Sequence, residues 1–283
     1  MMADHIPTVR QRRLAQALRE LRLKAGLTQE QVAAEMGWHS SKLFRLENAR
    51  SPRVDWIDVK ELLDLYGVAS PQRDALIQLA RDARRRGWWT PYSDVFTGSF
   101  VALEDAACLL RTYQSELVPG LFQTEEYART VITAVRPGLS SEEIARRVIA
   151  RMARQQAVLN RDHSAQLICL LNEAVVRRPI GGASTMRAQL SQLIEIGERP
   201  DVTVRVLPFA VGAHAAIEGP FVLLRFSGEY EPDVAYVEGA MGDLYLESVE
   251  EVRRYTLLFE HICELALDPE ETAIMVAAAA KEF

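Results

Sequence analysis

The chain has 283 residues, of which 48% are hydrophobic and 25% are charged, and its formal net charge is −6 at pH 7. This composition is typical of a globular protein rather than a disordered one, and the length suits about two domains of ordinary size. No stretch approaches the ~20 apolar residues of a membrane-spanning helix, and the first residues lack the apolar core of a signal peptide, so we expect a cytoplasmic protein.

Charge is distributed unevenly along the sequence. Residues 1–90 contain 16 Lys or Arg and 11 Asp or Glu, a net charge of +5, whereas the remaining residues contain 17 and 28, a net charge of −11. A basic first part and an acidic second part indicate that only the first part offers a surface suited to nucleic acid.

The first part is expected to be helical, because its apolar residues recur at helical spacing. Three helices are predicted over 10–25, 55–65 and about 71–86. A pair of shorter helices is predicted between the first and the second of these. In the 55–65 helix, Ile57, Leu62 and Leu65 are expected to face inward. A five-helix bundle follows from this pattern.

The central pair lies within residues 27–48. Thr28 is a good N-cap, with Gln31 placed to complete a capping box, and Gly37 can take the left-handed conformation that ends a helix. Ser40 is expected to cap the second short helix.

The second short helix has two distinct sides. Leu43, Phe44 and Leu46 are expected to face inward, and three residues are expected to point outward, namely Ser41, Lys42 and Arg45. Two short helices joined by a tight turn form the layout of a helix-turn-helix, whose second helix enters the major groove of DNA.

These residues also resemble the Xre/Cro-repressor class of DNA-binding domain. The resemblance rests on Arg12-Arg13-Leu14, Leu18 to Arg22, Gly26 to Glu30, Val32-Ala33, Met36-Gly37, Ser40 and Leu46-Glu47-Asn48. It implies an internal ion pair between Arg22 and Glu47 and a phosphate-contacting position for Gln29. It also implies base-facing positions for Ser40, Ser41 and Arg45. The full DNA-contacting set that we expect is Gln29, His39, Ser40, Ser41, Lys42, Arg45, Asn48 and Arg50.

We therefore predict a mainly α protein, with a DNA-binding domain over 8–83, a linker over 84–99 and an α+β domain with a small sheet over 100–275. In the linker, Arg84, Arg85 and Arg86 either contact phosphates or form a solvated helix end. The expected helices of the second domain are 103–117, 125–135, 140–161, 184–198, 247–267 and 270–281. Three to five strands are expected, from runs at 166–172, 202–208, 221–226, 233–238 and 244–246.

The long helix that starts at Ser140 or Ser141 carries a basic face within the acidic domain. Its arginines are Arg146, Arg147, Arg151, Arg154 and Arg161. They can pair with acidic groups of this chain or of a partner, and the default expectation is that they are solvated.

The second domain resembles the C-terminal domain of a large actinobacterial group of Xre-type regulators, including the WhiJ-like ones. The residues that carry this resemblance are Leu117 to Glu125, Arg147 to Gln155, Arg178 to Gly182, Val206 to Phe209, Gly212-Ala213-His214 and Gly242 to Glu247. The resemblance implies a repressor-like role, often with a small acidic partner protein.

We expect neither an enzyme nor a metal or cofactor site. The His and Glu residues of the second domain are scattered, and no nucleophile-elbow or phosphate-loop motif is present. The three cysteines, Cys108, Cys169 and Cys263, form no C-x-x-C pair and are expected to be buried thiols in a reducing compartment.

The sequence thus predicts a sequence-specific DNA-binding regulator that acts as a homodimer on an inverted repeat. One alternative is an antitoxin-like protein, whose second domain holds a small partner protein and whose DNA binding is autoregulatory. A further alternative is a small-molecule sensor with an effector pocket around Pro208, His214 and Phe221.

Overall fold

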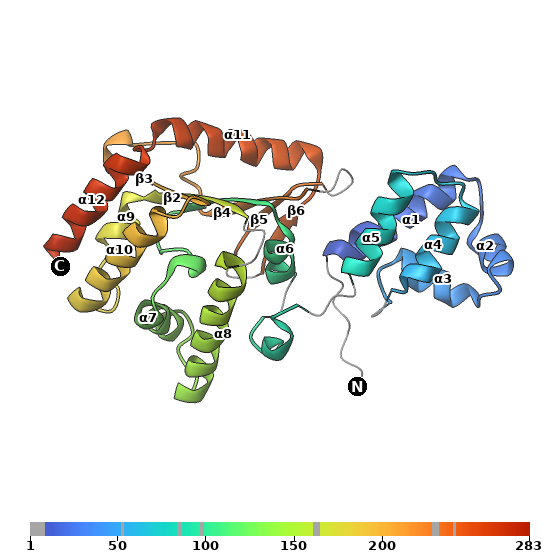
Figure 1. The fold of residues 1–283 in the computed structure, drawn as a ribbon, viewed down its shortest axis with the longest axis horizontal. Helices are drawn as coiled ribbons and strands as arrows, with labels where there is room; N and C mark the ends of the chain where they lie inside the picture. The colour runs from blue at the N-terminus through green and yellow to red at the C-terminus, as the bar shows by residue number, and fades with distance from the viewer. Residues whose placement is uncertain are drawn as a thin grey trace. The chain divides into compact units, whose positions relative to one another are not determined.

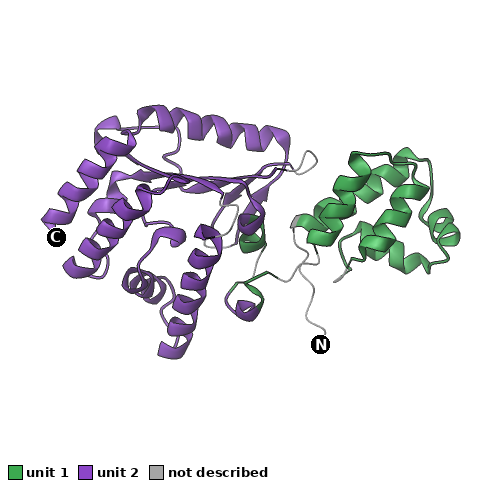
Figure 2. Cartoon of the chain, in the orientation of Figure 1, with its two compact units in different colours: residues 1–90, 96–103, 228–230 green, residues 91–95, 104–227, 231–283 purple. Residues whose placement is uncertain are grey.

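The fold was analysed in a computed structural model, which describes residues 9–51, 54–83, 87–96, 99–160, 165–227, 232–239 and 242–283. The chain divides into two compact units (Figure 2): the first contains most residues up to 90, and the second contains most residues from 104 onward. The three linker arginines, Arg84, Arg85 and Arg86, lie outside the described residues, as does Arg161.

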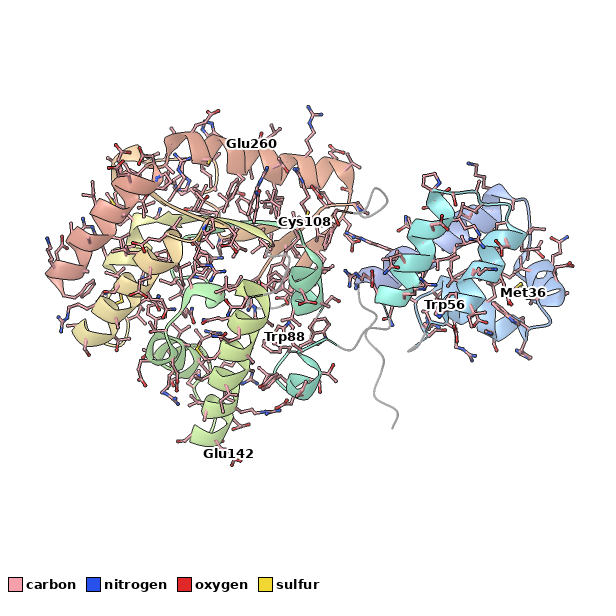
Figure 3. All side chains as sticks on the ribbon, viewed as in Figure 1. Met36, Trp56, Trp88, Cys108, Glu142 and Glu260 are labelled. Atoms are coloured by element: carbon pink, nitrogen blue, oxygen red, sulfur yellow. The ribbon has the colours of Figure 1, made fainter. Side chains whose placement is uncertain are left out.

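Within its described residues, the first unit contains five α-helices up to residue 82 (Figure 1). They are α1 (Val9–Lys24), α2 (Gln29–Glu35), α3 (Ser40–Glu47), α4 (Trp56–Leu65) and α5 (Gln72–Asp82). Leu18, Leu43 and Leu62 are fully buried at their common core. Met36 and Trp56, labelled in Figure 3, belong to the partly buried shell that packs against this core.

The prediction that Ile57 faces inward was wrong, because its side chain is 48% exposed. Asp55 caps α4 by accepting a hydrogen bond from the Ile57 backbone N–H, so Ile57 lies in the first turn. The buried stripe of α4 is instead Val59, Leu62 and Leu63, at the spacing of one helix face. Ile57 precedes this stripe by two residues, which turns its side chain toward solvent.

A mixed sheet forms the centre of the second unit, in the order β3-β2-β1-β4-β5-β6. Its described strands are β1 (Leu109–Gln114), β2 (Gln166–Asn172), β3 (Val202–Leu207), β4 (Phe221–Arg225), β5 (Val234–Val237) and β6 (Leu244–Leu246). The β3, β2 and β1 strands are parallel to each other, whereas β4 pairs antiparallel with β1, and β5 and β6 continue antiparallel.

The strand β1 is absent from the sequence prediction, which placed a helix over 103–117 and counted three to five strands. A short helix, α6 (Phe100–Ala106), ends before β1, and six strands are present among the described residues. Leu110 and Tyr113 point to opposite faces of β1, yet both are buried because the strand lies inside the sheet. Burial on both faces removes the period of two that identifies a strand, and the three-residue spacing of the two side chains imitates a helix.

Helices cover both faces of the sheet, with α11 on one side and α7, α8 and α10 on the other (Figure 1). Their bounds are α7 (Glu125–Val135), α8 (Ser141–Leu159), α9 (Glu173–Arg177), α10 (Ala183–Gly197), α11 (Val249–Leu265) and α12 (Pro269–Glu282). Short 3-10 turns occur at η1 (Thr90–Tyr92), η2 (Gly120–Phe122) and η3 (Phe209–Val211). In the part of the chain that is described, we find no helix with the length and apolarity needed to span a membrane.

The fully buried Gln189 on α10 fixes the loop that leads into α7. Its amide nitrogen donates to the Phe122 carbonyl at 2.7 Å, and its amide oxygen accepts from the Thr124 backbone N–H at 2.8 Å.

Replacing Gln189 by leucine leaves the Thr124 N–H without this acceptor, and we expect a loss of about 1–3 kcal/mol in the free energy of unfolding. Chemical denaturation measures the loss, with the exposed Ser191→Ala on the same helix as the control; equal stability of the two variants would contradict this role of Gln189.

Candidate nucleic-acid interface

The turn between α2 and α3 is held by local backbone chemistry. The Thr28 hydroxyl accepts from the Gln31 N–H at 3.2 Å, and the Gln31 side chain accepts from the Thr28 N–H at 2.8 Å, which completes the capping box. Gly37 has a φ of 64°, the left-handed conformation that a residue without a Cβ adopts most readily. These features set the direction in which α3 begins.

The N-cap of α3 is His39, not Ser40 as predicted. The His39 Nδ1 accepts from the Ser41 backbone N–H at 3.3 Å and lies 2.8 Å from the Ser41 hydroxyl oxygen. The imidazole therefore caps the helix in place of the Ser40 hydroxyl. Ser40 is the first residue of the helix, and its side chain is exposed. His39 and Ser41, both expected to contact DNA, are therefore hydrogen-bonded to each other.

Phe44 was predicted to face inward, but its side chain is 43% exposed. Leu43 and Leu46 fill the core side of α3, and Phe44 projects beyond the edge of that stripe. The Arg50 guanidinium lies 5.5 Å from the centre of the Phe44 ring, and the Asn48 amide donates to the Phe44 carbonyl at 2.8 Å. Phe44 thus contacts both Asn48 and Arg50, the two expected DNA-contacting residues that follow α3.

A buried ion pair lies beneath the helix-turn-helix. The Arg22 Nε lies 2.6 Å from Glu47 Oε1, and Nη2 lies 3.0 Å from Oε2, so the pair is bidentate. Only 7% of Arg22 and 4% of Glu47 is exposed. The hydrogen bond to Glu47 raises the pKa of Arg22, so the guanidinium is charged at neutral pH.

Two further bonds extend this ion pair to the turn before α2. The remaining arm of Arg22 donates to the Leu27 carbonyl at 2.8 Å, and the Gln29 amide donates to Glu47 Oε2 at 2.7 Å. Gln29, which was expected to contact a phosphate, is therefore bonded within the chain. We call Arg22, Leu27, Gln29 and Glu47 the buried polar network. It connects α1, the start of α2 and the end of α3.

The outward side of α3 is divided between bonded and available side chains. The Lys42 ammonium lies 2.8 Å from the Asp58 carboxylate on α4 and 3.8 Å from the centre of the Trp38 ring. Asp58 could not be predicted as the partner of Lys42, since no local sequence pattern links residues 16 positions apart. Arg45 is exposed, and no described residue forms a hydrogen bond or ion pair with its guanidinium. Of the two cations expected on this face, Arg45 is the one available to a ligand.

An open groove of ≈ 640 Å³ lies beside the buried polar network. Its walls include Arg19 and Leu23 from α1, Gln29 from α2, and Phe44 and Asn48 from the end of α3. The groove therefore brings expected DNA-contacting residues of two helices to one concave surface, next to a basic side chain of α1.

In the second unit, the three residues of the predicted effector pocket lie near the ends of β3 and β4. The His214 Nε2 is 3.4 Å from the Tyr113 hydroxyl, and the Tyr113 ring also lies 6.2 Å from that of Phe221. Pro208 precedes the η3 turn that leads toward His214. The His214 Nδ1 is buried and has no hydrogen-bond partner among the described residues, and burial lowers the pKa of this imidazole.

Three of the four arginines of α8 are bonded within the chain, contrary to the default expectation that they are solvated. Arg146 bonds to Asp94, Arg151 to Gln123 and Arg154 to Glu104, all within the second unit. The sequence did not identify these partners, because they lie 28 to 52 residues away along the chain.

No group of three or more His, Cys, Asp or Glu residues is arranged to hold a metal ion in the described part of the chain. The expectation of buried thiols holds for Cys169, whose pKa is raised by burial, but was wrong for Cys108, which is exposed. Cys108 lies between α6 and the start of β1, at an end of the sheet rather than inside it.

The helix-turn-helix geometry defines a DNA-binding class of protein, and comparison with protein families agrees with it. Residues 13–76 match a family model described as a helix-turn-helix domain. Residues 97–278, well over half of the chain, match a family described as a domain of unknown function, DUF5753. The chain therefore belongs to the DUF5753 family and carries an N-terminal helix-turn-helix domain. No curated protein and no solved structure matches it.

The buried polar network gives a direct stability test. Replacing Arg22 by alanine leaves the Glu47 carboxylate buried without its cation, and removing one partner of such a pair costs ~3–5 kcal/mol. We expect the first unit of this variant to melt at a clearly lower temperature. Thermal unfolding measures the change. Arg19→Ala, one turn earlier on the exposed side of α1, is the matched control. An unchanged melting curve for Arg22→Ala would show that the pair does not hold the unit together.

Proposed function

We propose that this protein is a sequence-specific transcriptional regulator that reads DNA with α3 and acts as a homodimer in the cytoplasm. The observation that carries the proposal is the exposed Arg45 on the outer face of α3, whose guanidinium has no bonded partner among the described residues, in a unit that matches a helix-turn-helix domain. An arginine at such a position can form a bidentate hydrogen-bond pair with guanine.

The groove beside the buried polar network supports a position for the DNA backbone. Arg19 and Asn48 supply a cation and an amide at its walls, and such groups suit phosphate and sugar contacts. In this proposal Gln29 acts indirectly: it holds Glu47 and so fixes the angle between α2 and α3. In this proposal Arg45 reads the bases, and Ser40, exposed at the start of α3, is a further candidate for base contact.

A single unit of this size makes few base contacts, which is why we propose a dimer on an inverted repeat. The resemblance to Xre/Cro repressors and to the WhiJ-like actinobacterial regulators supports the same assembly. The small acidic partner protein implied by that resemblance remains part of the proposal. We propose binding rather than catalysis for the second unit.

A second candidate function is favoured by one observation in the second unit. The buried, unbonded Nδ1 of His214, next to Tyr113 and Phe221, is a polar atom that a small ligand can satisfy. This supports the small-molecule sensor, in which an effector bound near Pro208, His214 and Phe221 controls DNA binding.

The role of Arg45 is tested by binding to cognate DNA and to variants of each base pair. Arg45→Ala is expected to relax specificity at one position by ~1–3 kcal/mol, because it removes one bidentate pair. Gln29→Ala is expected to weaken binding to every sequence by a similar factor, because it loosens the network rather than a base contact. If Arg45→Ala weakens binding equally to cognate and scrambled DNA, Arg45 does not read a base.

A further inference from the structure

The helix α8 presents two arginines to the loop around η2. A Cβ placed on Gly120 would lie 3.4 Å from Arg154 Nη1 and 3.9 Å from Arg151 Nε, so both guanidinium groups lie against this glycine. The Gln155 amide donates to the carbonyls of Gly120 and Gln123, each at 2.8 Å, which fixes the loop to the helix. The two cations are thus held close together by the fold.

Arg154 has a full counter-charge. Its Nε and Nη2 each lie 2.6 Å from an oxygen of Glu104, in the bidentate arrangement that compensates a buried guanidinium best. Glu104 itself is buried, which makes this pair a fixed part of the interior.

Arg151 lacks such a carboxylate. Its Nη1 donates to the Gln123 amide oxygen at 2.6 Å, and no described Asp or Glu forms an ion pair with its guanidinium. Burial, together with the nearby charge of Arg154, lowers the pKa of Arg151 to about 10, although the charge of Glu238 acts in the opposite direction. Arg151 therefore keeps its charge at neutral pH, but it has only a Coulombic attraction to Glu238 in place of a bonded counter-ion.

The position of Arg151 is nevertheless well defined. Gln123 is buried, and its amide nitrogen donates to the Val118 carbonyl at 2.7 Å, so its oxygen is aimed at Arg151. A guanidinium with only one arm bonded still presents N–H groups in a fork that matches a carboxylate or a phosphate. The arrangement is that of a binding group held in place before its ligand arrives.

We propose that Arg151, oriented by Gln123 and flanked by the Arg154–Glu104 pair, anchors a binding site for a small oxyanion ligand, one that carries a carboxylate or a phosphate. The site lies on the second unit, apart from the helix-turn-helix, and the proposal does not depend on DNA binding. It also differs from the surroundings of His214, since α8 and the η2 loop contribute none of the residues there.

The test uses the full chain and follows its melting temperature in sodium phosphate, sodium succinate and sodium chloride at equal ionic strength. A ligand that binds only the folded state raises the melting temperature with concentration. We expect phosphate or succinate to raise it above the chloride value, and the anion that does so identifies the ligand class. No rise with either anion would overturn the proposal.

Substitutions on α8 locate the effect. Arg151→Gln is expected to abolish the rise, whereas Arg147→Gln, which removes the same charge one turn earlier on α8, is expected to keep it. Arg151→Lys keeps the charge without the fork and is expected to need at least about tenfold more anion for the same rise. If Arg151→Gln does not fold, the lysine variant decides alone: an unshifted response to the anion would contradict the assignment to Arg151.

Discussion

The helix-turn-helix of this protein depends on one buried ion pair. Arg22 and Glu47 come from α1 and the end of α3, and their hydrogen bonds extend to Leu27 and Gln29. The pair fixes α3 against the rest of the unit, and it leaves the outer face of α3 for other contacts. Because the two charges are taken out of water, the geometry has to be good for the pair to stabilise the fold. The bidentate contact and the two extra bonds meet that requirement.

Structural features that depend only on residues close together in the sequence could be predicted from the sequence alone. The capping box at Thr28, the left-handed Gly37 and the start of α7 at Thr124 each depend on neighbouring residues, and the structure confirms them. The mixed sheet after a helical first part was also predicted. In contrast, β1 could not be recognised, because burial on both faces hides the alternation of a strand.

The candidate site shows the same division. The outward positions of Ser41, Lys42 and Arg45 followed from helical spacing, but that of Phe44 did not, and neither did the bonding partners of these residues. Lys42 is joined to Asp58 and Gln29 to Glu47, over separations that leave no local signal. His39, which was expected to contact DNA, also caps α3, since its Nδ1 can accept a backbone hydrogen bond as a serine hydroxyl does. The bonding partners of Arg146, Arg151 and Arg154 on α8 likewise became visible only in the folded chain.

Selection from a random DNA pool by the purified full chain tests whether the first unit reads a defined DNA sequence. We expect an enriched inverted repeat, with affinity for it that falls steeply as salt rises, because phosphate contacts release counterions. We also expect much weaker binding to scrambled DNA of the same composition. If no sequence is enriched, or if scrambled DNA binds equally well, the helix-turn-helix is not a sequence reader in this protein.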